Sequence, residues 1–532
     1  MKKLLTTLLL ALLTLAFVLF AVACSDVNDP DSSENDDIIS DGTPDEKEKV
    51  SEGLAYELSA NGKYYTVTGI GTCTDTDVVI PSKYKSIPVT VIGSDAFANC
   101  TSLVSVKISD GVTSIDFSAF YNCTNLTSVT IPDSVTTIGY AAFYECKSLT
   151  NVKIGAGVKN IRDCFGRLLS YNEYDNAYYL GNDVNPYRFL INAKDKSISS
   201  VIIHEKTETI QDSAFLGCTE LVEVTIPDSV KIVGIDVFHD CSNLQNVVFG
   251  DGVTSIGEFS FKGCVNLTNI SIPDSLEECG NLFGFTSIPK LAYTLYNNGA
   301  YLGNEENPYV LLFSSLSDGD VIVHEKTRVI SGAAFAYSKV RSISIPKSVV
   351  GIGRNAFEGG ADSVYIEDLT AWCNIKFSNY SMLGSLSLAN PISSGAKLYL
   401  NKTLVEEVVI PESITSINAY AFYGYKYLKS VVIGNNVKDI GNYAFHNCSS
   451  LTSVVIGEGI TSIADYAFNS CDSLENVYYL GTFEEWNSIS VGSSNDSFVS
   501  APRYYYSEEL PTDNTYNYWH YVDGVPTKWE IS

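Results

Sequence analysis

The side chains in this chain that could do the most chemistry, by forming disulfides or binding a metal, are its 13 cysteines. Many recur at a step of 23 residues, in the three groups Cys100-Cys123-Cys146, Cys218-Cys241-Cys264 and Cys448-Cys471. No Cys-x-x-Cys pair occurs, so the ligand spacing of a zinc site is absent. Cysteines one repeat apart would be close enough for a disulfide, but a column of identical inward side chains seldom has the Cβ orientation that the bond needs. We expect buried free thiols and no metal site, and the oxidation of stacked pairs stays open.

Two identical His-Glu-Lys-Thr stretches, beginning at His204 and His324, start like the zinc motif of metalloproteases. Glu208 and Arg328 occupy the positions where the second histidine would be needed, so no pair of ligands one helical turn apart can form. We interpret the two stretches as equivalent strand edges. The chain has five histidines, and we find no arrangement that pairs a Ser, Cys or Lys nucleophile with a base. We therefore expect no enzymatic activity, no catalytic residue and no cofactor.

A repeat of about 23 residues defines the elements that position these side chains. Such a period, with apolar residues at fixed offsets, is typical of a solenoid in which each unit packs only against its neighbours. In the unit from Cys123 to Cys146 we expect a strand over 126–131, a Pro-Asp turn, a shorter strand over 135–138, and a helical turn in which Phe143 fills the core. Coils about 4.8 Å apart would stack equivalent side chains into columns of Leu, Ile, Phe and Cys.

Interruptions of the period are themselves duplicated. The same Tyr-Leu-Gly-Asn, Asn-Pro-Tyr and His-Glu-Lys-Thr elements occur over 179–207 and over 301–327, which a β-hairpin inserted into a coil would explain. Another pair of related segments contains Trp372 and Trp486, and in the second copy Thr482 and Glu485 predict a capping box at the start of a short helix.

Hairpins are predicted at both ends of the ordered chain. One turns at Asn61-Gly62, and the other turns at Asp523-Gly524 and would place Trp519 and Tyr521 opposite Trp529. Aromatic residues at the inserts and the C-terminus either bind sugars or proteins, or cover open ends of the core: Tyr187, Tyr309, Trp372, Trp486, Trp519 and Trp529.

The N-terminus has the layout of an export signal. Lys2 and Lys3 precede an apolar run over 4–20, and small residues then lead to Cys24. This segment resembles the lipobox of bacterial lipoproteins, although Ala21 stands where Leu is usual, and the resemblance implies that Cys24 is the lipidated first residue of the mature chain. A plain signal peptide and an uncleaved anchor are the alternatives. Residues 25–53 are too polar to form a core and predict a disordered acidic tether.

We therefore predict five regions. They are a lipoprotein-type signal peptide (1–24), the tether (25–53), an N-terminal capping hairpin (54–77), a repeat solenoid (78–480) with insertions near 165–203, 280–323 and 364–404, and a C-terminal capping segment (481–532).

The net charge of −28, from 62 acidic and 34 basic residues, leaves no basic stripe for nucleic acid. The abundance of Tyr, Ser, Thr and Asn indicates exposed β-structure and a secreted or surface protein.

The repeat Cys-x-x-Leu-x-x-Val-x-Ile-Pro-x-x-Val-x-x-Ile-x-x-x-Ala-Phe-x-x-Cys, read from Cys123 to Cys146, resembles that of the BspA-like leucine-rich repeat family of bacterial surface proteins. The resemblance covers roughly residues 56–480. It implies a β-rich leucine-rich repeat solenoid at the bacterial cell surface, associated with adhesion to host or bacterial partners. It carries over no catalytic residue.

The outward positions of the long strands form our candidate ligand face, because they vary while the inward residues stay apolar. Its residues are Ser105, Lys107, Ser128, Thr130, Asn151, Lys153, Glu223, Thr225, Asn246, Asn269, Ser271, Ser430, Ser453 and Asn476. We expect them to line one continuous face that binds extracellular proteins or glycans. The alternative is a self-associating surface component or a spacer without a specific ligand. The protein would be held at the membrane by its lipid, or secreted, and the sequence does not name the ligand.

Overall fold

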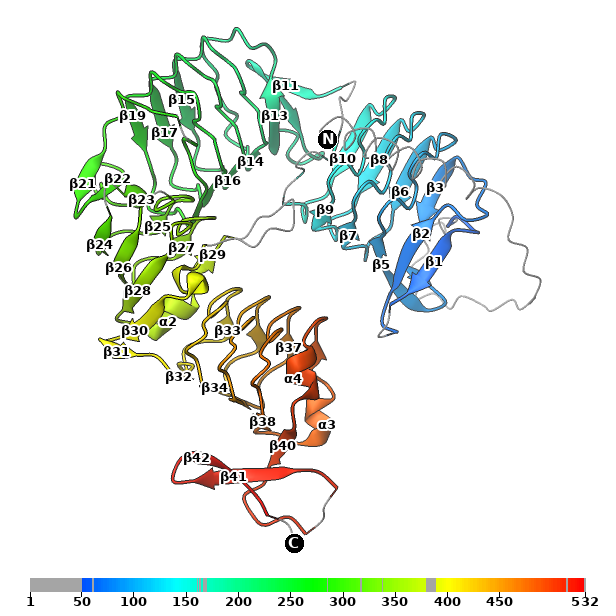
Figure 1. Ribbon diagram of the computed structural model, residues 1–532. Helices are drawn as coiled ribbons and strands as arrows, with labels where there is room; N and C mark the ends of the chain where they lie inside the picture. Colours follow the sequence, from blue (N-terminus) through cyan, green and yellow to red (C-terminus); the bar gives the residue numbers. More distant parts are fainter. Residues whose placement is uncertain are drawn as a thin grey trace, which may run out of the picture. The chain divides into compact units, whose positions relative to one another are not determined.

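The computed structural model describes residues 50–530 except 60–61, 160, 162–163, 166–169, 285, 316–317, 337, 379–388 and 513–514. The predicted signal peptide, Cys24 and residues 25–49 of the predicted tether lie outside the described residues. The described chain is a β-solenoid in which most coils contribute one long and one two-residue strand to two different sets of sheets (Figure 1). This confirms the predicted fold class.

The long strands form four sheets, joined mainly by parallel pairing between successive coils. The first contains β3 (Asp77–Ile80), β6 (Ser105–Ile108), β8 (Ser128–Ile131) and β10 (Asn151–Ile154). The second contains β15 (Glu223–Ile226), β17 (Asn246–Phe249) and β19 (Asn269–Ser271). The third contains β24 (Gly319–Ile322), β26 (Val340–Ile345), β28 (Ala361–Ile366), β30 (Lys397–Leu400) and β31 (Thr403–Leu404). The fourth contains β32 (Glu407–Val409), β34 (Ser430–Ile433), β36 (Ser453–Ile456), β38 (Asn476–Tyr479), β40 (Arg503–Tyr506), β41 (Tyr518–Val522) and β42 (Val525–Lys528).

The short strands form four further sheets with the hairpins. The first contains β1 (Ala55–Leu58), β2 (Tyr65–Gly69), β4 (Lys83–Tyr84), β5 (Ile87–Ile92), β7 (Ser114–Ile115) and β9 (Thr137–Ile138). The second contains β11 (Asn172–Tyr174), β12 (Ala177–Leu180), β13 (Phe189–Ala193), β14 (Thr209–Ile210), β16 (Ile232–Val233), β18 (Ser255–Ile256) and β20 (Glu278–Cys279). The third contains β21 (Thr294–Tyr296), β22 (Gly299–Leu302), β23 (Leu311–Ser315), β25 (Val329–Ile330), β27 (Gly351–Ile352) and β29 (Lys376–Phe377), and the fourth contains β33 (Ser416–Ile417), β35 (Asp439–Ile440), β37 (Ser462–Ile463) and β39 (Ser490–Val491). Short helices are α2 (Leu369–Cys373), η1 (Pro391–Ser394), α3 (Phe483–Trp486) and α4 (Asp496–Ser500).

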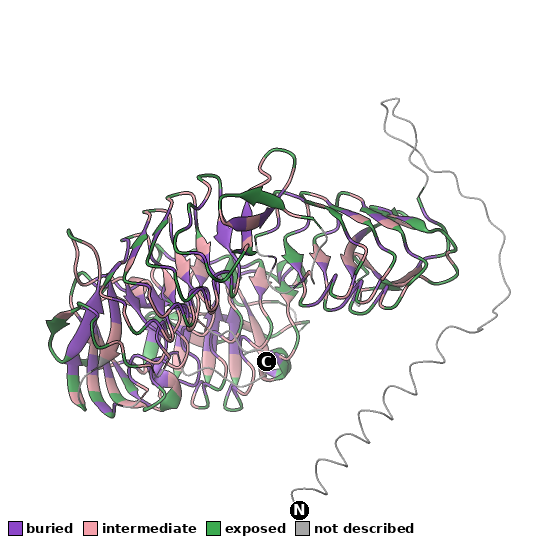
Figure 2. Ribbon diagram, turned by 90° about the horizontal axis from the view of Figure 1, so that it is seen from above, coloured by how far each residue is buried: buried purple, intermediate pink, exposed green. Residues whose placement is uncertain are grey.

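Columns of identical side chains fill the core, as predicted. Phe120 and Phe143 stack with ring centroids 5.0 Å apart, and the thiol of Cys146 donates to the carbonyl oxygen of Phe120 at 3.1 Å. In the described coils the same contact, from a thiol to a carbonyl 26 residues earlier, recurs at Cys123, Cys241, Cys264, Cys448 and Cys471. Cysteine therefore combines a small apolar volume with a donor for a buried carbonyl. Figure 2 shows the buried residues concentrated along the strands.

The predicted helical turn at the phenylalanine is wrong. Two residues before Phe143, Ala141 has a φ of 56°, and two residues after it, Glu145 has a φ of 62°. The segment between them is a pair of turns rather than a helix, and bonds between coils hold it, such as Phe143 N–H to the Cys164 carbonyl at 2.6 Å. These intercoil bonds compensate for a backbone conformation that L-residues rarely adopt.

The first insert is the antiparallel meander β11-β12-β13, and the second is its counterpart β21-β22-β23. Each ends in parallel pairing to a short strand of the solenoid, β13 to β14 and β23 to β25. The His-Glu-Lys-Thr stretches are turns rather than the predicted strand edges, because Thr207 N–H donates to the His204 carbonyl and the side-chain Nδ1 of His204 accepts from Lys206 N–H. His204 stacks on Tyr187 at 4.0 Å, and His324 stacks on Tyr309 at 3.6 Å.

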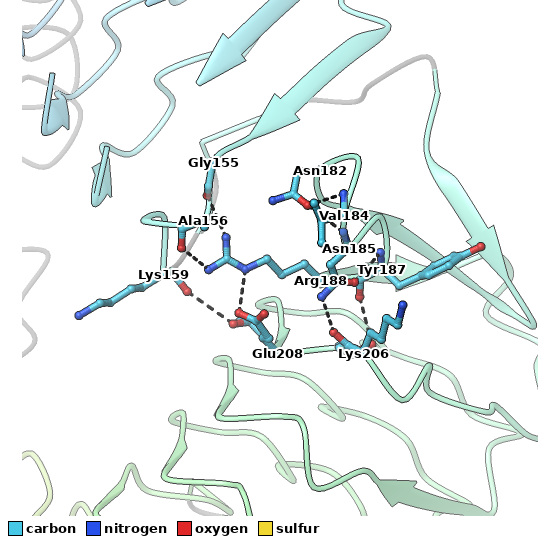
Figure 3. A network of polar contacts seen from close by, with 12 residues as sticks. Gly155, Ala156, Lys159, Asn182, Val184, Asn185, Tyr187, Arg188, Lys206 and Glu208 are labelled. Atoms are coloured by element: carbon cyan, nitrogen blue, oxygen red, sulfur yellow. Dashed lines mark hydrogen bonds and ion pairs between the residues drawn. The ribbon is translucent and has the colours of Figure 1, made fainter. Parts of the chain in front are cut away.

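Arg188 fastens the first insert to the coil before it (Figure 3). Its guanidinium donates to the carbonyls of Gly155 and Ala156, both at 2.9 Å, and to the carboxylate of Glu208 at 2.7 Å. The side chain is buried, so its charge has to be compensated by these three hydrogen-bond partners. The three bonds join the insert to the residues that follow β10. In the second insert Val310 takes the equivalent position.

Both terminal hairpins are present. β1 pairs antiparallel with β2, and β41 pairs antiparallel with β42. The predicted capping box of α3 is confirmed, since Thr482 and Glu485 each bond to the other's backbone N–H. The predicted facing of Trp519 and Tyr521 with Trp529 is wrong, because Trp519 lies opposite Lys528 and Tyr521 opposite Pro526. Trp529 instead stacks on His520 at 3.7 Å.

Candidate ligand-binding face

Strand alternation places every residue of the candidate face outside the core, and none is buried. Along β8 the side chains of Val129 and Ile131 point inward, which leaves Ser128 half-buried and Thr130 exposed. Parallel pairing then aligns equivalent residues into rows. The rows are Ser105-Ser128-Asn151, Lys107-Thr130-Lys153, Glu223-Asn246-Asn269, Thr225-Val248-Ser271 and Ser430-Ser453-Asn476. The residues themselves remain a predicted binding surface.

The predicted continuity of this face is wrong at the level of hydrogen-bonded sheets. Its residues fall in three separate sheets, and the first two end at β10 and β19. In the chain the first insert comes after β10, and the second comes after β19 and the short strand β20. Each hairpin occupies the place where the next long strand would continue the ladder. The candidate face is therefore segmented.

A further part of the outer surface was missed from the sequence. On the third sheet, Ser344, Tyr365 and Tyr399 form a row, and the two tyrosine rings stack at 4.9 Å. The neighbouring Arg341 pairs with Asp320, and hydrogen bonding to Arg341 and Ser342 lowers the pKa of that carboxyl to about 2. The register shift near Gly319 and Asp320 and the segment before β30 break the 23-residue step in this sheet, which concealed these positions.

Two clefts border the face, one beside each insert. The first has a volume of about 510 Å³ and lies between the outer strand β10 and the first insert. The second, about 840 Å³, lies between β19 and the second insert. Equivalent residues line both clefts, in the pairs Asn151 and Asn269, Tyr171 and Tyr293, Asn182 and Asn304, and Asp183 and Glu305. The cleft is therefore duplicated in the chain together with the insert that borders it.

The charges of the two clefts differ. In the first, Lys153 Nζ lies 2.8 Å from the carboxylate of Asp183. The second has Ser271 in place of that lysine, and Asp251, Asp274, Glu305 and Glu306 line it without any lysine or arginine among its described lining residues.

The core repeat on which this face is built matches the model of the BspA type leucine rich repeat region (6 copies) over residues 72–173, 190–301, 312–398 and 392–497. The chain belongs to the BspA-type leucine-rich repeat family. No curated protein matches this BspA-type chain.

Several solved structures are similar to the BspA-type chain in fold. A leucine-rich repeat protein from Bacteroides ovatus is 22% identical, with 84% of this chain and 90% of that chain covered and a TM-score of 0.23. A leucine rich cell surface protein from Faecalibacterium prausnitzii is 24% identical, with 83% and 97% covered and a TM-score of 0.25. The leucine rich repeat protein of T. pallidum is 24% identical over 46% of this chain and 91% of its own, with a TM-score of 0.23.

In the described part of the BspA-type chain, no group of three or more His, Cys, Asp or Glu side chains is arranged to hold a metal ion. The aromatic residues at the inserts and the C-terminus mainly pack, because Trp372, Trp486 and Trp519 are buried. In the described ranges no helix has the length and apolar character needed to cross a membrane. The absence of enzymatic activity and of a cofactor remains a prediction.

Proposed function

We propose that this chain is a cell-surface binding protein that presents its segmented outer face to extracellular protein or glycan ligands. One observation carries the proposal: polar side chains of varied type form in-register rows on the long strands, while the inward side chains of the same strands repeat with little change. A solenoid of this kind offers an extended surface without altering its core. Membership of a repeat family with a scaffold of this type supports the assignment.

The charge of the chain favours ligands with exposed basic groups. A net charge of −28 attracts cationic surfaces and repels polyanions such as nucleic acid. Lys107 and Lys153 stand out as exposed cations in one row of the first sheet. Such rim charges chiefly affect the association rate and the choice of partner.

The test uses residues 50–532, a fragment that retains Ser51, whose hydroxyl donates to Asp75. Purified extracellular matrix proteins and polysaccharides are immobilised one by one, and binding is measured by interferometry. We expect saturable binding to at least one of them, and Lys107→Glu with Lys153→Glu should change the affinity by about tenfold. The control is Lys147→Glu, which reverses an exposed charge away from the face. Self-association without any ligand, measured by light scattering, would favour the surface-component or spacer alternative.

Membrane attachment through a lipid on Cys24 is part of the same proposal and places the protein at the bacterial cell surface. It is supported by the basic, apolar and small-residue order before Cys24. Replacing Cys24 with alanine should move the protein from the membrane fraction to the medium or leave it unprocessed, as read by fractionation and mass of the mature N-terminus. Unchanged processing and fractionation would favour a signal anchor instead.

A further inference from the structure

Each cleft contains a stretch of strand edge whose backbone groups have no partner among the described residues. In β19, Asn269 N–H donates back to the Gln245 carbonyl, so the alternation of a parallel ladder turns the N–H and C=O of Ile270 toward the cleft. In the regular coils these groups pair with the next long strand. At Ile270 that strand is missing, and among the described residues neither group has a partner.

The two neighbouring positions on the same edge are occupied by the insert. The Thr268 carbonyl accepts from Ala292 N–H at 2.9 Å, and Ile272 N–H donates to the Gly303 carbonyl at 2.9 Å. The open edge is therefore a window centred on one residue. The window between these two bonded positions is about 13 Å long, which allows two or three residues of an extended peptide.

The first cleft repeats this arrangement. Asn151 N–H donates to the Thr127 carbonyl, which turns Val152 outward, and no described residue pairs with the N–H or C=O of Val152. The flanking groups again have partners in the insert. The hydroxyl of Ser170 donates to the Thr150 carbonyl, and Ile154 N–H donates to the Gly181 carbonyl. The recurrence of the same open residue beside both inserts argues that the hairpins create the window each time.

We propose that the second cleft binds a short extended peptide segment with a basic side chain, which pairs its backbone with Ile270. An incoming residue in extended conformation offers the N–H and C=O that the edge of Ile270 lacks, as in strand addition to a sheet edge. The carboxylates of Asp251, Asp274, Glu305 and Glu306 surround this edge, and they complement a lysine or arginine rather than an uncharged sugar. In the first cleft Lys153 and Asp183 pair with each other, so the preference for a cation belongs to the second cleft.

This proposal deepens the proposed function, since Asn269 and Ser271 of the candidate face line the second cleft. The probe is the blocked tripeptide acetyl-Ala-Lys-Ala-amide, titrated into residues 50–532 at low salt and followed by NMR. We expect weak saturable binding that falls about tenfold when the backbone nitrogen of the lysine residue is methylated, because that change removes one hydrogen bond. The matched probes are acetyl-Ala-Glu-Ala-amide and N-acetylglucosamine, and neither should bind comparably.

Two variants locate the site. Ser271→Trp should obstruct the second cleft beside Ile270 and abolish tripeptide binding. Val265→Trp, a substitution at an exposed position off the face, should leave binding intact. Circular dichroism of both variants checks that they fold. Binding that ignores backbone methylation or Ser271→Trp overturns the proposal, as does tighter binding of the sugar. Capture of an extracellular ligand through Lys107 and Lys153 without any tripeptide binding overturns the cleft proposal alone and leaves the binding function in place.

Discussion

Replacing Phe238 with alanine is expected to lower the free energy of unfolding by about 3 to 5 kcal/mol. The ring is completely buried, and its centroid lies 5.4 Å from that of Phe215 and 5.5 Å from that of Phe261. Its removal leaves a cavity in a column and takes a stacking partner from both neighbouring coils. Because a solenoid is held together by contacts between adjacent coils, the loss weakens two interfaces at once.

Phe117→Ala is the matched control, since it makes the same substitution at an outward ladder. Phe117 is 51% exposed and stacks on Tyr140 at 6.0 Å. We expect a change within about 0.5 kcal/mol there. Urea denaturation followed by circular dichroism compares the two variants with the parent. Equal losses at Phe238 and Phe117 would contradict a core built of columns.

The phenylalanine columns could be predicted from the sequence because their cause lies in the repeat itself. A fixed step of 23 residues brings Phe97, Phe120 and Phe143 to the same place in successive coils, and the rings stack at 4.9 and 5.0 Å. Strand alternation likewise determined the exposure of residues such as Lys107 and Thr130. These outcomes depend on local periodicity alone.

The turns around each phenylalanine could not be predicted in this way. Ala141, Phe259 and Tyr443 have φ values of 56°, 59° and 59°, and none of these residue types favours the left-handed region. Bonds to the next coil impose the conformation. A signal did exist two residues after the phenylalanine, where Asn99, Asn122 and several glycines recur, since these residues tolerate a positive φ.

The clefts depend on which sheet the inserts join, and sequence could not decide that. Both hairpins were predicted, but the strand β13 pairs with the short strand β14, so it extends one set of sheets and interrupts the other. The strand edges at Val152 and Ile270, which no described residue pairs, are the result of this choice. The candidate residues Asn151 and Asn269 were identified from alternation, without the cleft that each one lines.

The buried cysteines are expected to make the fold lose stability at alkaline pH. Burial raises the pKa of Cys264, Cys279, Cys373 and Cys471 to about 12 in each case. An exposed thiol in the unfolded chain has a pKa of about 8.5. The folded state therefore keeps protons that the unfolded state releases, and the stabilisation is complete below about pH 8.5 and is lost as the pH rises toward 12.

Each such thiol contributes a slope of about 1.4 kcal/mol per pH unit, so these four alone lower the free energy of unfolding by about 5 kcal/mol per unit above pH 9. Urea midpoints measured from pH 7 to pH 10 in the presence of a reductant give the slope. The double variant Cys264→Ala with Cys471→Ala should reduce the slope by about 2 to 3 kcal/mol per pH unit, because the two thiols that donate to Phe238 and Phe445 no longer titrate. Ser260→Ala, which removes a buried hydroxyl that donates to the Gly234 carbonyl and leaves all four thiols in place, is the control for a general loss of packing. An unchanged slope in the double variant would place the alkaline sensitivity in buried tyrosines such as Tyr179 and Tyr301, whose pKa burial raises to about 12, and would contradict a titrating role for the cysteine columns.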